Sequence, residues 1–389
     1  MTNGRKVFEK IRDRADAAVF FNETDQLWLT GFFTTDGLVV VNGEKTLLIT
    51  DSRYFEAAEL KKQAHELQDD VEVILLDKGI NDAFGRYANE KRIAFDSEQM
   101  TVSRLEGLKK NFTAEFVGIP AITTDFRAIK SDFEVSMIEK AQSITDAAFD
   151  HILGYIKPGL TETDVAAELE FFMKKKGAQC PAFETIAVSG KKSSMPHGVP
   201  ESIVLTENSF LTMDFGAKYN GYCSDMTRTV VLGKADDEMK RVYNTVLEAQ
   251  LAGIAAAHGG ALGKDVDKAA RDIIDNAGST ARATRAASAT GWATPWASRS
   301  MKTPDLLLSS TRNARYSQSL RLNPAYISRA STVSVLRIWY FSARTAAATL
   351  RIRPSSLSKS EYKTQKNCSK ALTNAAFSVM ICCKYVYAY

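Results

Sequence analysis

The charge balance and the hydrophobic pattern of the sequence change after Gly278. This change limits the part of the chain that can form ordinary folded domains. Residues 279–389 contain 17 Lys and Arg but only two acidic residues, which leaves 33 basic and 44 acidic residues in 1–278. The two parts carry net charges of +15 and −11, although the whole chain of 389 residues carries only +4. Hydrophobic periodicity also fails in the second part. We therefore expect the folded domains within 1–278.

The rest of the composition excludes several classes of protein. With 45% hydrophobic and 10% aromatic residues, the chain is not collagen-like, a coiled coil or wholly disordered. No run of eighteen apolar residues predicts a membrane span, and the first six residues lack the apolar stretch of a secretory signal. The five cysteines have neither zinc-type nor disulfide-type spacing, which favours the reducing cytoplasm.

The first 125 residues are predicted to alternate strands and helices, as an α/β domain does. Strands at 36–41 and 46–50 flank Asn42-Gly43, a dipeptide typical of a type I′ hairpin turn. The remaining predicted elements are helices at 53–64 and 102–109 and strands at 71–76, 92–95 and 115–118.

A second region begins near residue 127 and favours an α+β arrangement, because strands and long helices follow one another without strict alternation. A capping box at Thr161-Glu162-Thr163-Asp164 begins one of its helices. The predicted elements are helices at 132–155, 161–176 and 236–258, a strand at 185–189 and a hairpin of 209–218 with 222–232.

Two aspartates are predicted to share one face of this hairpin. If Asn220-Gly221 forms a two-residue turn, Gly216 lies opposite Asp225 and Asp214 is a diagonal neighbour of Asp225. The Cα atoms of such neighbours are roughly 7–8 Å apart. A divalent cation such as Mg, Ca, Mn or Co converts the repulsion between their carboxylates into attraction. Aspartate is disfavoured in strands, so we interpret the pair as a candidate metal site; two solvated residues at a hairpin edge are the alternative.

His197 is a candidate catalytic residue. It lies in a turn-rich segment between Pro196 and Pro200, whose rings restrict the backbone, and an imidazole there can move protons near neutral pH. An uninvolved surface histidine is the alternative. The neighbouring Lys191-Lys192 is most simply interpreted as a solvated charge pair, and the other three histidines, on helical stretches, as structural residues.

Several short motifs occur together in the second region: Ile129-Lys130-Ser131, Ile156-Lys157-Pro158-Gly159-Leu160-Thr161-Glu162, Ala182-Phe183-Glu184-Thr185-Ile186, Pro196-His197-Gly198 and Asp214-Phe215-Gly216. With them, residues 128–278 resemble the metallopeptidase family of Xaa-Pro aminopeptidases, Xaa-Pro dipeptidases (prolidases) and creatinase. Residues 1–125 are similar to the N-terminal domain of that family through Thr30-Gly31-Phe32 and Asp51-Ser52-Arg53-Tyr54-Phe55. The resemblance covers about 278 of the 389 residues.

The resemblance implies an α+β fold with three parts. They are an N-terminal α/β creatinase/prolidase-like domain at 1–126, a truncated pita-bread metallopeptidase domain at 127–278, and a non-native or disordered region without a family domain at 279–389. It also implies that Asp214 and Asp225 are ligands of two divalent metal ions, usually manganese or cobalt, with Asp225 bridging both. His197 would contact the substrate and assist proton transfer, beside a metal-bridging hydroxide that attacks the scissile carbonyl.

Three further metal ligands of the family are missing. They are a His in Gly-His-x-x-Gly, a Glu in Glu-Pro-Gly and a Glu in Arg-x-Glu-Asp, and none of these motifs follows Gly278. All three motifs become possible, in the family's order, when residues after Gly278 are back-translated and read in a shifted frame. Each codon of that frame consists of the third base of one residue's codon and the first two bases of the next. In that frame Trp292-Ala293 and Trp296-Ala297 each force a glycine and Met301-Lys302 forces a glutamate. We therefore predict a frameshift near codon 278, from a damaged gene or a sequence error. The alternative left open by composition alone is a basic disordered tail or nucleic-acid-binding arm.

The resemblance thus implies a metallo-aminopeptidase of the Xaa-Pro type that acts on peptides with proline at the second position. We expect it to be cytoplasmic and to bind neither nucleic acid nor a membrane. Prolidase activity is the alternative. With two ligands of five, this exact chain is expected to be inactive. A different hypothesis is a truncated pseudoenzyme whose first domain still folds and forms a homodimer. We also expect poor solubility, because the second domain lacks strands that complete its sheet.

Overall fold

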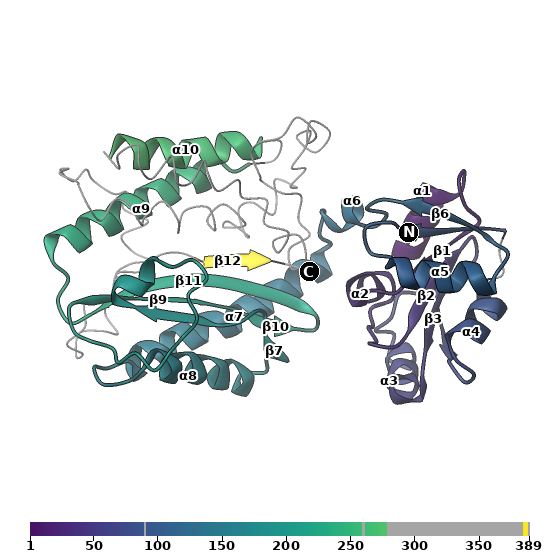
Figure 1. Cartoon of the computed structure of the whole chain (residues 1–389), viewed down its shortest axis with the longest axis horizontal. Coiled ribbons are helices and arrows are strands. Elements are labelled where there is room, and N and C mark those ends of the chain that lie inside the picture. Colours follow the sequence, from purple (N-terminus) through teal and green to yellow (C-terminus); the bar gives the residue numbers. More distant parts are fainter. Residues whose placement is uncertain (89–90, 259–260, 278–383, 388–389) are drawn as a thin grey trace. The chain divides into compact units, whose positions relative to one another are not determined.

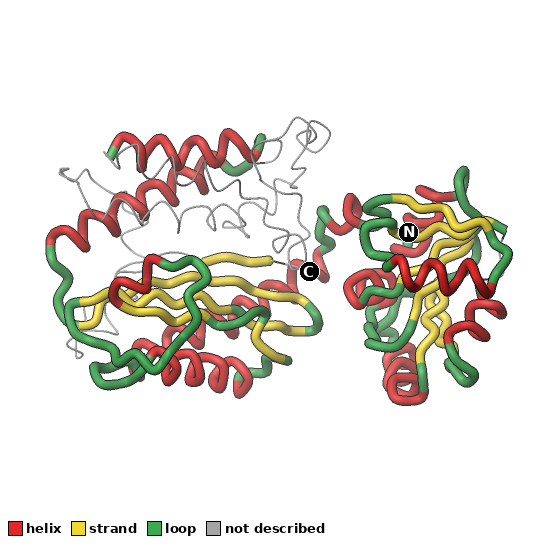
Figure 2. Tube along the Cα trace, in the orientation of Figure 1, coloured by secondary structure: helices red, strands yellow, loops and turns green. Residues whose placement is uncertain are grey.

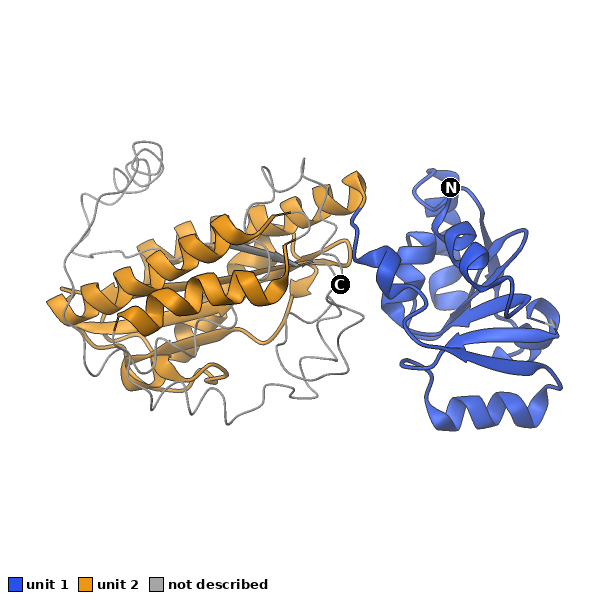
Figure 3. Cartoon of the chain, turned by 90° about the horizontal axis from the view of Figure 1, so that it is seen from above, with its two compact units in different colours: residues 1–130 blue, residues 131–389 orange. Residues whose placement is uncertain are grey.

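The computed structural model describes residues 1–88, 91–258, 261–277 and the strand at 384–387. The chain divides into two compact units, Met1–Lys130 and Ser131–Tyr389 (Figure 3). Each unit holds one six-stranded sheet with helices packed against it (Figure 1, Figure 2). The expectation of a non-native or disordered region at 279–389 concerns residues outside the described part, apart from that one strand.

The first unit contains a mixed sheet with the strand order β4-β3-β2-β1-β5-β6. The β1–β2 and β2–β3 pairs are antiparallel, whereas β3–β4, β1–β5 and β5–β6 are parallel. Its elements are α1 (Asn3–Ile11), β1 (Ala17–Phe20), α2 (Glu23–Thr30), β2 (Leu38–Asn42), β3 (Thr46–Thr50), α3 (Ser52–Gln63), β4 (Val71–Leu75), α4 (Ile80–Tyr87), β5 (Arg92–Asp96), α5 (Val102–Asn111), β6 (Glu115–Ile119) and α6 (Thr124–Arg127).

Both faces of this sheet are buried, so the inner positions of its central strands are apolar on both faces. In β2, Val39 and Val41 belong to one hydrophobic cluster, whereas Leu38 and Val40 belong to the cluster on the other face. Continuous apolar strands are what a sheet covered by helices on both sides requires. The α/β prediction for this part of the chain is therefore confirmed.

The two Asn-Gly dipeptides form different turns. Asn220 and Gly221 have φ angles of 47° and 82°, as a type I′ turn requires. Neither Asn42 nor Gly43 has a positive φ, so the predicted type I′ turn after β2 is wrong, although the hairpin itself is confirmed. The Asn42 side chain instead accepts hydrogen bonds from the backbone N–H groups of the two residues before β3, which closes the turn without left-handed backbone.

The second unit contains a sheet with the order β7-β10-β11-β9-β8, and β12 pairs with the other edge of β11. Each of its described strand pairs is antiparallel. Its elements are α7 (Asp132–Tyr155), α8 (Glu162–Lys175), β7 (Cys180–Pro181), β8 (Ile186–Ser189), the 3₁₀ helix η1 (Gly190–Ser194), β9 (Ser209–Phe215), β10 (Ala217–Tyr219), β11 (Tyr222–Leu232), α9 (Asp237–Ala256), α10 (Gly263–Asn276) and β12 (Lys384–Tyr387).

One face of this second sheet is covered by α7 and α8 (Figure 1). The helices begin where the sequence predicts, at capping boxes formed by Ser131 with Glu134 and by Thr161 with Asp164. Their buried residues and alternate residues of β8, β9 and β11 form one hydrophobic cluster, whereas α9 and α10 pack on each other through a smaller separate cluster. None of the described helices combines the length and the apolar character needed to cross a membrane.

Candidate functional site

The β9–β10–β11 hairpin has the register that its sequence predicts. Tyr219 pairs with Tyr222 next to the turn, and Asp214 pairs with Thr227 farther along the strands. Between these pairs the same register places Asp225 opposite Gly216. Asp214 and Asp225 are therefore diagonal neighbours on one face of the sheet, which is the register expected from the sequence.

The two aspartates point away from α7 and α8. Met213, Phe215 and Met226 alternate with them along the strands and belong to the cluster beneath those helices. The aspartates consequently lie on the opposite face. Asp225 is only 4% exposed and Asp214 is half-buried, so neither is the fully solvated edge residue of the alternative interpretation.

A glycine between the aspartates allows the two strands to approach closely. A Cβ atom added to Gly216 would lie 1.9 Å from the backbone oxygen of Ser224, a distance that no side chain tolerates. Gly216 also separates β9 from β10, and the Ser224 hydroxyl accepts a hydrogen bond from the backbone N–H of Ala217 at 2.9 Å. Gly216 thus has a steric reason to be glycine, independent of any chemistry at the site.

His197 lies in an exposed loop that rests on the same face of the sheet. We call residues 190–200 the His197 loop; it contains η1 and follows β8. A Cβ atom added to Gly198 would lie 2.9 Å from Cγ1 of Val188, so the loop backbone packs directly on that side chain. Val188 pairs with Thr212, two residues before Asp214, and therefore points to the same face as Asp214. The three candidate residues share one side of the sheet.

A buried carboxylate contacts the ends of the His197 loop, and this contact was not predicted from the sequence. Glu162, in the first turn of α8, is fully buried and accepts hydrogen bonds from Ser189, Lys192 and Glu201. Its partner Lys192 is only 13% exposed, so the interpretation of Lys191-Lys192 as a solvated pair is wrong for the second lysine. The sequence carries no signal for this contact, because an acidic residue in the first turn of a helix is equally common on the surface.

Burial and ion pairing act in opposite directions on Lys192. Loss of contact with water disfavours its ammonium, but hydrogen bonds to Glu201 and Glu162 overcome this effect and raise the pKa of Lys192 above its usual value. The ion pair with Glu162 is 3.0 Å long and that with Glu201 is 2.9 Å long. Lys192 therefore remains charged and stays in place between the two carboxylates.

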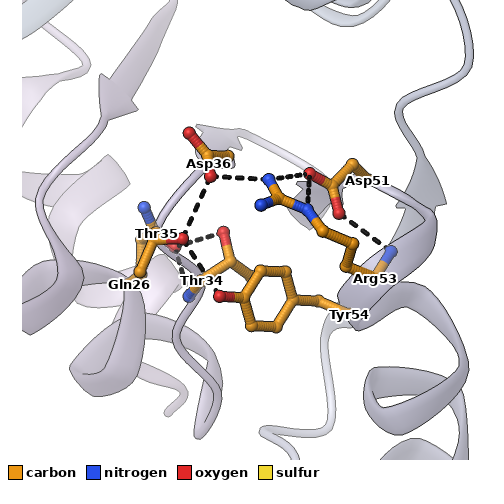
Figure 4. A network of polar contacts seen from close by, with 7 residues as sticks. All are labelled: Gln26, Thr34, Thr35, Asp36, Asp51, Arg53 and Tyr54. Atoms are coloured by element: carbon orange, nitrogen blue, oxygen red, sulfur yellow. Dashed lines mark hydrogen bonds and ion pairs between the residues drawn. The ribbon is translucent and has the colours of Figure 1, made fainter.

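A polar cluster in the first unit has a structural explanation. Figure 4 shows Arg53 between Asp36 and Asp51, with Tyr54 bonded to Thr35. The Arg53 guanidinium lowers the pKa of both carboxyls, and Asp51 also caps the first turn of α3. The cluster is exposed and ties the segment before β2 to the start of α3. The Asp51-Ser52-Arg53-Tyr54-Phe55 motif therefore forms a helix cap and an ion pair.

The donor set at the aspartate pair is incomplete for a metal centre. Carboxylate oxygens are suitable ligands for Mg, Mn and Co. Within the described ranges, however, no group of three or more His, Cys, Asp and Glu side chains is placed to hold a metal ion. Asp214 and Asp225 alone do not fit the requirement for a dinuclear centre, because two carboxylates supply too few ligands and too little negative charge.

Comparisons with known proteins support one family. The model of the creatinase/prolidase N-terminal domain matches residues 9–129, and that of metallopeptidase family M24 matches residues 136–293. An uncharacterized peptidase of Bacillus subtilis is 37% identical over 261 residues, which cover 67% of this chain and 73% of the relative.

Solved structures agree with this result. The Xaa-Pro dipeptidase of Bacillus anthracis is 36% identical with a TM-score of 0.64, covering 71% of this chain and 76% of that one. The X-Pro aminopeptidase of Thermotoga maritima is 32% identical with a TM-score of 0.62, covering 68% and 76%. With both domains matched in order and this identity sustained over most of a relative's length, the chain belongs to the creatinase/prolidase type of metallopeptidase family M24.

Proposed function

We propose that the sequence encodes an exopeptidase that hydrolyses the bond between an N-terminal residue and a following proline. The observation that carries the proposal is the pair of carboxylates Asp214 and Asp225 on one sheet face, with the His197 loop on the same face. In this proposal the two aspartates are metal ligands and His197 contacts the peptide. Some relatives similar to the chain are named as Xaa-Pro aminopeptidases and others as Xaa-Pro dipeptidases. Of these two activities, we favour the aminopeptidase activity for this chain.

The chain as written is, in the same proposal, inactive. Two carboxylates do not hold two divalent ions, and the described residues offer no third ligand of the Asp, Glu, His or Cys type beside them. The rival proposal is a non-catalytic relative whose first domain folds alone. The incomplete ligand set among the described residues also favours this rival proposal. Missing ligands abolish the metal centre but do not affect the folded sheet of the first unit.

Metal analysis and peptidase assays test both proposals. We expect the purified chain, dialysed against Mn²⁺ or Co²⁺, to bind fewer than two ions and to cleave neither Xaa-Pro-Xaa tripeptides nor Xaa-Pro dipeptides. Two tightly bound ions per chain, together with cleavage of either peptide, would refute the hypothesis that the chain as written is inactive. Faster cleavage of tripeptides than of dipeptides would then identify an aminopeptidase, and the reverse result a prolidase.

We propose further that residues 279–389 are translated out of frame. The change of charge after Gly278 and the three ligand motifs available in one shifted frame support this proposal. Nucleotide sequencing around codon 278 tests it directly, and an undamaged reading frame there would refute it. Insertion of one base near that codon should restore the family's ligand motifs, metal binding and peptidase activity. Insertion of two bases is the matched control and should restore none of them.

A further inference from the structure

The apolar side chains beside His197 contribute little buried surface to the His197 loop. Met195 and Val199, on either side of His197, are 48% and 65% exposed, and His197 itself is exposed. The backbone at Gly198 packs against Val188, and η1, at the start of the loop, lies against β8 and β9. The end of the loop beyond Gly198 is half-buried or exposed, so its position depends on polar contacts.

Both ends of the loop are bonded to the same buried carboxylate. Oε1 of Glu162 accepts hydrogen bonds from the backbone N–H and the hydroxyl of Ser189, at 2.6 and 3.0 Å. Its Oε2 accepts from Nζ of Lys192 at 3.0 Å and from the backbone N–H of Glu201 at 3.2 Å. Ser189 directly precedes the loop, Lys192 lies near its start and Glu201 directly follows it, so one side chain joins the two ends.

The backbone around Glu162 reinforces this connection. Its own N–H donates to the backbone oxygen of Ile203 at 3.0 Å, and the N–H of Thr163 donates to that of Glu201 at 3.3 Å. The start of α8 does not need the Glu162 carboxylate, because the capping box is formed by Thr161 and Asp164. The carboxylate therefore serves the loop and not the helix.

We propose that Glu162 is a positioning residue that fixes the His197 loop over the sheet face carrying Asp214 and Asp225. It acts through the loop and touches none of the three. A charged acceptor serving four donors in a buried site makes stronger hydrogen bonds than a neutral one, so it holds the loop ends in a single arrangement. The consequence for catalysis rests on the proposed function, whereas the effect on the loop does not.

Hydrogen exchange of the full-length chain tests the proposal. Glu162→Gln keeps the size of the side chain but removes its charge and one acceptor oxygen. We expect peptides spanning 189–201 to exchange about tenfold faster or more, because hydrogen bonds to a charged group are lost. Peptides from α8 and β9 should keep their exchange rates. A residue that merely stabilises the fold would raise exchange throughout the second unit.

Glu168→Gln is the matched control. Glu168 is a carboxylate of the same helix, but it contacts His151 of α7 and not the loop. We expect this variant to leave exchange in 189–201 unchanged. Equal exchange of the loop in the two variants would overturn the proposal, as would a uniform rise across the second unit in Glu162→Gln.

Lys192→Met provides a second variant if Glu162→Gln does not fold. It preserves the buried carboxylate and its bonds to Ser189 and Glu201 and removes the ion pairs of Lys192 with Glu162 and with Glu201. Faster exchange confined to 190–196 supports the proposal, and unchanged exchange overturns it. If the base insertion restores activity, Glu162→Gln should lower kcat with little change in KM. Failure of the frame-restored chain in every peptidase assay would refute the proposed function and leave the exchange result intact.

Discussion

Cys223 provides a probe of the sheet face that carries the aspartates. It lies two residues before Asp225 in β11 and so shares its face, whereas Cys180, on the edge strand β7, is exposed. Burial away from water is the main cause that raises the pKa of the Cys223 thiol to about 12. Because the thiolate is the reactive form, this cysteine should be inert at neutral pH.

We expect iodoacetamide at pH 8 to alkylate Cys223 at least about 100-fold more slowly than Cys180 in the folded chain. Raising the pH to 9.5 leaves Cys223 almost fully protonated, because the pKa of its thiol is raised to about 12, so its labelling should remain slow. Peptide mass spectrometry measures both rates, and labelling in urea is the control, where the two should become similar. Comparable labelling in the folded chain would show that this sheet face is open to solvent.

At the scale of elements, the hairpin depends on one close approach of its strands. Gly216→Ala places a methyl group against the backbone of Ser224, which cannot move without breaking the register that pairs Asp214 with Thr227. We expect this change to lower the free energy of unfolding of the second unit by about 2 kcal/mol or more. The control is Gly154→Ala in α7, where a Cβ atom meets nothing within 4 Å and stability should be unchanged or slightly higher. Urea midpoints compare the two, and equal midpoints would contradict the steric argument.

Elements with strong local signals are the ones that the sequence predicts. The apolar period of 132–155 predicts the bounds of α7, and the Asn220-Gly221 turn predicts the register of the aspartates. In contrast, α10 was not predicted, and neither were α1, β1, α2 and α4. Gly259-Gly260, just before α10, interrupts the helical pattern of the sequence.

The contact between Glu162 and Lys192 could not be predicted for a different reason. The two residues are thirty positions apart, and their meeting depends on how α8 packs against β8 and the loop after it. Local helix propensity does not show which side chain in the first turn of a helix faces a loop that is distant in the sequence. The same limit applies to the turn at Asn42, where a side-chain hydrogen bond replaced the backbone geometry typical of its dipeptide.

At the scale of the whole molecule, the two units differ in how completely the described residues cover their sheets. In the first unit, two hydrophobic clusters cover both faces of the sheet. In the second, α7 and α8 cover one face, and among the described residues β12 reaches only Cys223–Met226 of one edge of β11. A sheet edge of this kind favours association with other chains.

The difference between the units predicts how fragments behave. A fragment of residues 1–130 contains every strand of its sheet and both clusters, so we expect it to be monodisperse and to unfold cooperatively. A fragment of residues 131–277 lacks β12 and should aggregate at the same concentration, and the full chain should be less soluble than 1–130. Size-exclusion chromatography and urea unfolding followed by circular dichroism measure these properties. A soluble, monodisperse full chain would contradict the expectation that the incomplete second sheet lowers solubility. Non-cooperative unfolding of the 1–130 fragment would contradict the independent folding of the first unit.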